Sequence, residues 1–148
     1  MTYRRVGGDE TRTRYASAPI VRVESRTDSS MCVQIAFWSG EGPAGSSKRY
    51  TVVSFLDVME FGWVEFDFGG PKENRFDFEF ALIEIVDSER INGILLRDRD
   101  TDQGSATWSV AGLHHFRLGF DDHGTYDIVA LSVELAIGES SNDVLPPL

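Results

Sequence analysis

The sequence predicts an all-β fold, an antiparallel β-sandwich or bent meander of eight to nine short strands with at most one short helix. Three observations lead to this prediction. Apolar and polar residues alternate with a period of two over several stretches, which is typical of half-buried strands. Clusters of Gly, Pro, Asn, Asp and Ser separate these stretches. No stretch has a convincing amphipathic helical period, so the strands have to bury their apolar faces against one another.

Length and composition predict a single domain that needs no covalent cross-link. The chain has 148 residues, enough to bury a sizeable core. Its one cysteine, Cys32, cannot form an internal disulfide, which indicates a reducing compartment. We expect Cys32 to be a small residue of the core. No run of 18 apolar residues occurs, so we expect a soluble, cytoplasmic protein. Its expected organisation is a flexible arm (1–17), one β domain (18–138) and a flexible tail (139–148).

The first strands are predicted at residues 19–24 and 31–38, as a hairpin joined by a polar turn. A glycine-rich loop follows, in which Gly40 and Gly45 are spaced as in a phosphate-binding loop. Ser46 stands where that motif requires lysine, and a strand rather than a helix comes next. The loop is therefore interpreted as a hairpin connection.

The central part of the chain combines core residues with acid. Strands are predicted at residues 50–57, 61–68 and 76–86. Between Asp57 and Asp87 only Lys72 and Arg75 oppose nine carboxylates, so most of the net charge of −10 lies there. The carboxylates are Asp57, Glu60, Glu65, Asp67, Glu73, Asp77, Glu79, Glu84 and Asp87. The solvent face of the central sheet is thus predicted to carry a strong negative potential.

This charge restricts the class of partner. An isoelectric point near 4.6 disfavours nucleic acid and anionic membranes, whose phosphates would be repelled. The negative charge favours a basic protein partner. The alternative is that the charge serves only to keep the protein soluble.

The second half of the chain is predicted to close the sheet. Residues 91–97 fit either a strand or a short helix, and strands are expected at 106–110, 113–120 and 126–137. Residues 121–125 form a hairpin turn in which Gly124 suits the position with φ > 0.

Two groups of residues resemble metal sites. Asp98, Asp100 and Asp102 alternate as in a calcium loop, but the glycine and the bidentate glutamate of an EF-hand are missing. An exposed polar loop is expected there, with calcium binding left open. His114 and His115 are predicted to point to opposite faces of one strand and so cannot share an ion. We therefore expect no metal and no cofactor.

No motif indicates catalysis. The sequence has no G-x-S-x-G, no S-x-x-K and no reactive-cysteine context, and carboxylate pairs carry no specificity in so acidic a chain. We therefore expect a protein that is not an enzyme. Trp38, Trp63 and Trp108 are a candidate stacking platform for a sugar, but at least one of them is expected in the core, and the sequence does not place the others.

The order of predicted elements carries a family resemblance. A hairpin is followed by the block Tyr50-Thr-Val-Val-Ser-Phe-Leu-Asp-Val-Met-Glu-Phe61, then by hydrophobic-acidic strands, then by the segment from His115 to Glu134 with its Asp-Asp-His-Gly-Thr turn. This pattern resembles the immunity protein 50 family of bacterial polymorphic-toxin systems. The resemblance implies a non-enzymatic cytoplasmic inhibitor that binds a co-encoded toxin, with no catalytic residues to transfer.

The expected function is therefore protein binding through an acidic β face. Six residues are the predicted partner-binding set: Glu60, Trp63, Glu65, Asp67, Asp77 and Glu79. A structural subunit of a larger assembly, and a calcium- or sugar-binding β domain, remain the alternatives.

Overall fold

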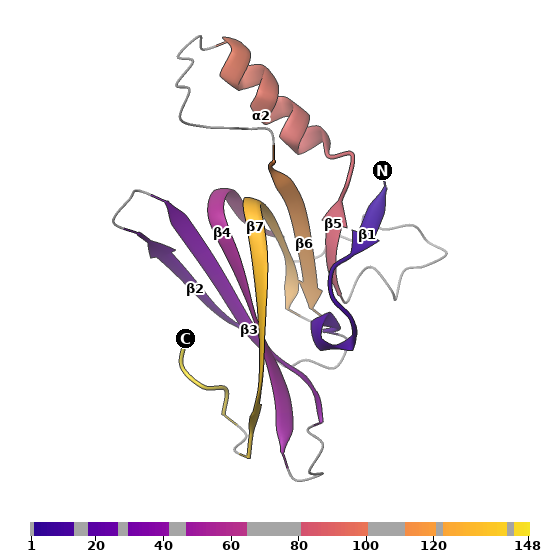
Figure 1. Cartoon of the computed structure of the whole chain (residues 1–148), viewed down its shortest axis with the longest axis vertical. Coiled ribbons are helices and arrows are strands. Elements are labelled where there is room, and N and C mark those ends of the chain that lie inside the picture. Colours follow the sequence, from indigo (N-terminus) through magenta and orange to yellow (C-terminus); the bar gives the residue numbers. More distant parts are fainter. Residues whose placement is uncertain are drawn as a thin grey trace.

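A computed structural model describes residues 2–13, 18–26, 30–41, 47–64, 81–100, 112–120, 123–141 and 144–148, with helix side chains described as far as residue 96. Seven strands of this part form one antiparallel sheet in the order β1-β5-β6-β7-β4-β3-β2 (Figure 1). They are β1 (Tyr3–Arg5), β2 (Ile20–Ser25), β3 (Met31–Glu41), β4 (Lys48–Val64), β5 (Leu82–Ile85), β6 (His114–Phe120) and β7 (Gly124–Ser140). A 3-10 turn, η1 (Asp9–Thr11), and one α-helix, α2 (Glu89–Asp100), complete the described elements. The all-β prediction is confirmed, although the sheet is single rather than split in two.

The sheet bends back on itself where its two longest strands turn a corner together. β4 and β7 pair along nearly their whole length, and both curl over at one end (Figure 1). At the corner Asp57 adopts a left-handed backbone conformation with φ of +54°, and a bulge follows between Val58 and Glu60. Such irregularities increase the bend of a strand pair locally. β4 and β7 therefore run through both layers of the folded sheet.

Aromatic contacts show that the two halves of the bent sheet pack together. β3 and β6 are not neighbours in the sheet, yet the rings of Phe37 and Phe120 meet edge to face at 5.3 Å. Phe55 of β4 similarly lies 5.5 Å from Phe116 of β6. Twelve buried side chains form the core between the layers: Val33, Ile35, Phe37, Val53, Phe55, Val58, Leu82, Phe116, Leu118, Phe120, Ile128 and Ala130.

The corner explains two departures from the predicted strands. The sequence predicts separate strands at 50–57 and 61–68, whereas β4 runs unbroken from Lys48 to Val64. Strict alternation in the last strand predicts Val129 and Val133 on one face, but Ala130 and Val133 are the residues that contact the core. The side-chain alternation changes phase at the corner, and an uninterrupted period of two cannot show this.

The local hairpins are as predicted. β2 pairs antiparallel with β3, and β3 pairs with β4 down to Glu41 and Lys48, which makes the glycine-rich segment a hairpin connection. β6 pairs with β7, and Gly124 has φ of +82° at the turn. Residues 91–97 belong to helix α2, which Ser88 precedes as the capping residue; its Oγ lies 3.4 Å from the Ile91 amide.

Described elements and buried residues occur in both segments that the sequence predicts as a flexible arm and a flexible tail. At the N-terminal end, β1 pairs with β5, and the side chains of Thr11 and Thr13 are buried against the rest of the protein. At the other end β7 extends to Ser140, and Leu145 is 8% exposed. The predicted strand at 106–110 and residues 76–80 of the one at 76–86 lie outside the described residues.

Candidate functional site

Trp63 is a large, exposed side chain with a fixed position. It lies at the end of β4 and is 52% exposed. Its Nε1 donates a hydrogen bond of 2.9 Å to the carbonyl oxygen of His123 in the β6–β7 turn. A Cβ atom at Gly124 would approach the same Nε1 to 2.5 Å, so the ring lies against this glycine. The sheet therefore presents an aromatic surface that is already ordered.

Glu60 lies on the opposite face of the sheet from Trp63. Trp63 pairs with Tyr126, which packs against the core, whereas Glu60 pairs with Val129, and the neighbours Ile128 and Ala130 are core residues. Because directly opposed residues share a face and successive residues alternate, the two side chains point in opposite directions. The Glu60 carboxylate lies 3.7 Å from Nε of Arg90 and so links β4 to helix α2. These two members of the predicted binding set do not form one patch.

Trp63 also lies on the opposite face of the sheet from the one that the sequence predicts. The sequence pattern places Val64 on the apolar face and Trp63 on the solvent face. In the structure Phe61 packs against the core and shares its face with Trp63, while Val64 is 42% exposed. The bulge before Glu60 shifts the alternation and accounts for the difference. Glu65, Asp67, Asp77 and Glu79, the remaining predicted residues, lie outside the described part of the chain.

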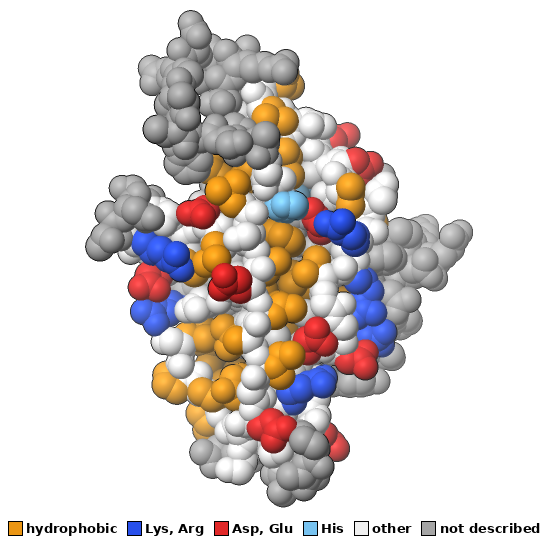
Figure 2. Space-filling model, in the orientation of Figure 1, with side chains coloured by type: hydrophobic (Ala, Val, Ile, Leu, Met, Phe, Trp, Pro, Cys, Tyr) orange, Lys and Arg blue, Asp and Glu red, His pale blue; other side chains and the backbone are white. Residues whose placement is uncertain are grey.

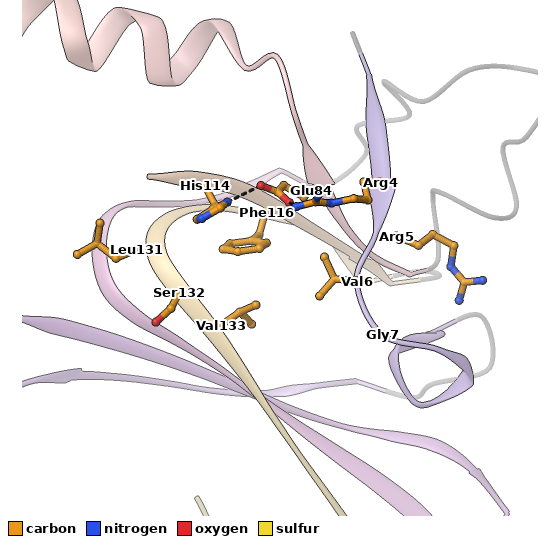
Figure 3. Close-up of a pocket in the computed structure, with 10 residues that line it drawn as sticks. All are labelled: Arg4, Arg5, Val6, Gly7, Glu84, His114, Phe116, Leu131, Ser132 and Val133. Atoms are coloured by element: carbon orange, nitrogen blue, oxygen red, sulfur yellow. Dashed lines mark hydrogen bonds and ion pairs between the residues drawn. The ribbon is translucent and has the colours of Figure 1, made fainter. Parts of the chain in front are cut away.

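A pocket of about 450 Å³ opens beside the corner of the sheet (Figure 3). Its apolar lining includes Val6, Phe116 and Val133, which lie on or against the core. Its polar side is a row of three charged or titratable groups contributed by three strands, Arg4, Glu84 and His114. Sequence analysis missed this site because β1 and β5 are brought together by pairing between distant segments.

Glu84 is the centre of the polar row in the pocket. One carboxylate oxygen accepts a hydrogen bond from Arg4, and the other contacts Nδ1 of His114 (Figure 3). Burial would raise the pKa of Glu84, but the hydrogen bonds from His114 and Arg4 outweigh it, and the pKa lies below its usual value. Glu84 is therefore ionised near neutral pH, and Nδ1 of His114 carries the hydrogen. In the neutral ring Nε2 is then an acceptor, on a side chain that is 40% exposed.

The opposite face of β6 and β7 carries a second polar cluster, which is buried. Nδ1 of His115 lies 2.7 Å from Oγ of Ser88, and its Nε2 lies 2.7 Å from Oδ1 of Asp127. Nε of Arg117 donates to the same Asp127 oxygen at 3.2 Å. Burial would raise the pKa of Asp127, but the His115 hydrogen bond and the nearby Arg117 charge lower it overall. The prediction that His114 and His115 point to opposite faces is thus confirmed.

The Ser88, His115 and Asp127 cluster has the composition of a catalytic triad, but its contacts indicate a structural role. Both ring nitrogens of His115 are occupied, and Ser88 also caps helix α2 through the Ile91 amide. All three triad side chains are buried, and none lines the pocket. An attacking serine needs space for a substrate beside its oxygen. The cluster instead connects the start of α2 to the sheet, because Ser88 contacts both the Ile91 amide and His115.

The other predicted sites are separated or lie outside the described residues. Asp98 and Asp100 belong to the backbone of helix α2, and Asp102 lies outside the described residues. Among the described side chains no group of three or more His, Cys, Asp or Glu could hold a metal ion. Trp38 stacks edge to face with Tyr50, near the opposite end of β4 from Trp63, so these two tryptophans form no shared platform.

The described surface mixes charges of both signs. Figure 2 shows acidic and basic side chains interspersed around an apolar band on the face it presents. A continuous acidic patch is not visible in the described part of this face. None of the described helices is long and apolar enough to span a membrane.

Comparisons with protein-family models, with curated proteins and with solved structures gave no match to this chain.

Proposed function

We propose that this protein is a non-enzymatic binding domain for a basic protein, with Trp63 as the aromatic anchor of its interface. The observation that carries the proposal is the position of Trp63, half exposed yet held by the His123 carbonyl and by Gly124. Tryptophan is among the residues that contribute most to protein interfaces. A ring that is ordered before binding loses little entropy on binding, so its burial adds to affinity almost in full.

The acidic segment next to Trp63 supports a basic partner. Glu65 and Asp67 lie two and four residues after Trp63 in the chain, and the protein has a net charge of −10. Opposite charges on two proteins accelerate their encounter and disfavour partners of the wrong sign. An immunity protein that neutralises a co-encoded toxin, as the sequence resemblance implies, would use charge in this way. Nuclease toxins are basic because they hold phosphate, and they are the partner class that we favour.

The experiment is an affinity purification from the native host at low salt, eluted with a salt gradient and analysed by mass spectrometry. We expect a stoichiometric basic protein that leaves only at high salt. Recovery of the bait alone would contradict the proposal.

Variants then localise the interface with the partner so identified. Trp63→Ala is expected to weaken binding by about 2 kcal/mol or more, mainly through faster dissociation. The double variant Glu65→Lys, Asp67→Lys should slow association at low salt. The double variant Glu134→Lys, Glu139→Lys, at exposed positions of β7, is the control with the same change in net charge away from Trp63. Equal effects of the control and the double variant would show that only net charge matters.

The pocket favours a second candidate function, the binding of a small ligand that is partly apolar. Its volume of about 450 Å³ lies in the range of ligand sites, and it combines an apolar lining with Arg4 and His114. A thermal-shift screen of simple sugars tests this function, since a bound ligand raises the melting temperature. His114→Ala should abolish any shift, and His123→Ala, which lies outside the pocket, should leave it unchanged.

A further inference from the structure

Strand β2 forms one edge of the sheet and exposes both charged and apolar side chains. It pairs with β3 on one side, and no other described strand pairs with it. The side chains of Arg22 and Glu24 are 47% and 49% exposed, and Val23 is 50% exposed. An edge strand of this kind offers unpaired backbone groups to another strand.

The hydrogen-bond pattern shows which backbone groups of β2 point outward. The amide of Arg26 donates to the carbonyl of Ser30 at 2.8 Å, so these opposed residues form a hydrogen-bonded pair. Hydrogen-bonded pairs alternate along an antiparallel ladder, and the β2–β3 register is regular. Glu24 and Arg22 therefore bond to β3. The amide and carbonyl groups of Val21, Val23 and Ser25 point away from it, toward the free edge.

We propose that β2 pairs with β2 of a second copy of this chain, antiparallel about a twofold axis at Val23. In this register Val23 opposes its own copy and Val21 opposes Ser25, so every outward backbone group in these residues gains a partner. Arg22 then stands directly opposite Glu24 of the other copy, and by symmetry this pair occurs twice. Arg22 and Glu24 fall in non-hydrogen-bonded pairs, where opposed side chains are closest.

The same strand disfavours the neighbouring registers. A shift of the twofold axis by one residue places either Arg22 or Glu24 opposite its own copy, and like charges directly opposite are destabilising. An axis midway between two residues would instead oppose outward-pointing to inward-pointing backbone groups, which cannot bond. The charges of the edge strand therefore select one pairing.

Arg22 already makes two contacts within one copy. Its Nη2 lies 3.8 Å from Glu24 within the same strand, and its Nη1 donates to the carbonyl oxygen of Leu148 at 2.6 Å. Addition of the second copy would give a two-by-two group of charges in which each charge has neighbours of opposite sign. Since such exposed pairs contribute little each, the backbone ladder supplies most of the affinity, and the charges set the register.

The test is sedimentation of the full chain over concentrations from micromolar to millimolar. The unchanged protein is expected to be a dimer at the upper end. Arg22→Glu and Glu24→Arg should each weaken dimerisation at least tenfold, because each opposes like charges twice. An equimolar mixture of these two variants should dimerise again, since every opposed pair is then of opposite sign. The double variant Arg22→Glu, Glu24→Arg should also recover dimerisation.

Further measurements separate the pairing from a loss of fold and from other interfaces. Val23→Pro removes an outward amide but no bond to β3, so it should abolish dimerisation while the circular dichroism spectrum stays unchanged. Trp63→Ala should leave the dimer intact, because Trp63 belongs to β4. A monomer at every concentration, or failure of the variant mixture to associate when the single variants are folded, would overturn the proposal.

Discussion

Trp63 and Gly124 are in direct contact across the paired ends of β4 and β7, with the indole nitrogen only 2.5 Å from the position that a Cβ atom of residue 124 would take. The turn between β6 and β7 therefore determines the position of the exposed ring. Two observations require glycine at position 124. Its φ is +82°, and the carbonyl oxygen of Val64 also lies only 2.6 Å from the position of a Cβ atom there.

Gly124→Ala is accordingly expected to destabilise the protein by about 2 kcal/mol or more, since it adds a conformational penalty to overpacking. It should also displace the ring of Trp63 and change its fluorescence. Urea denaturation followed by tryptophan emission measures both effects. Gly62→Ala, where a Cβ atom would meet nothing within 4 Å, is the control for a glycine in the same pair of strands. A loss no larger than that of the control would contradict the assigned contact.

Asp127→Asn should destabilise the fold by about 3 kcal/mol or more, because it removes the charge that His115 and Arg117 contact in a buried site. Chemical denaturation gives the difference in unfolding free energy. Glu134→Gln, at an exposed position of β7, should change stability by less than about 0.5 kcal/mol. Similar effects of the two substitutions would show that the buried cluster contributes nothing.

Stability is expected to fall in acid. The pKa values of Glu84 and Asp127 are lowered in the folded state, so the folded protein binds fewer protons than the unfolded chain at the same pH. Their contribution is fully present above the unfolded pKa values of about 4 and is lost as the pH falls through the lower folded values. Thermal melts between pH 7 and pH 2 should show a plateau and then a decline below about pH 4. An Asp127→Asn variant should show a shallower decline, and an equal melting temperature at pH 7 and pH 3 would refute the assignment.

Asp57 occupies a left-handed conformation at the corner of β4, with φ of +54°. Aspartate tolerates this conformation better than most residues, and a β-branched side chain tolerates it poorly. Asp57→Val is therefore expected to be less stable than Asp57→Gly by about 1–3 kcal/mol. The two variants form a matched pair because both remove the carboxylate, and their melting temperatures provide the comparison. Equal stability would mean that the backbone at residue 57 carries no strain.

Local features were readable from the sequence because near neighbours determine them. The β2–β3 and β6–β7 hairpins, the positive φ of Gly124 and the opposite directions of His114 and His115 all follow from alternation and turn chemistry. Residues 91–97 fit a strand as well as a short helix, and the structure selects the helix.

Long-range features were not readable. The corner at Asp57 shifts the alternation of β4 and β7 together, and this shift reversed the faces assigned to Trp63 and Val64. The pairing of β1 with β5, which creates the polar side of the pocket, joins segments that share no local signal. The contact between Trp63 and the carbonyl of His123 spans 60 residues and depends on the same sheet geometry.

The pairing of β4 with β7 has a consequence for folding during synthesis of the chain. Lys48 pairs with Ser140, so the sheet cannot be completed until the last strand has left the ribosome. Until then β3 and the first half of β4 present an apolar hairpin with an open edge, and pairings between such distant segments form slowly, in milliseconds to seconds. The nascent chain thus passes through a period in which β4, one of its two longest strands, has an unpaired edge that other chains can reach.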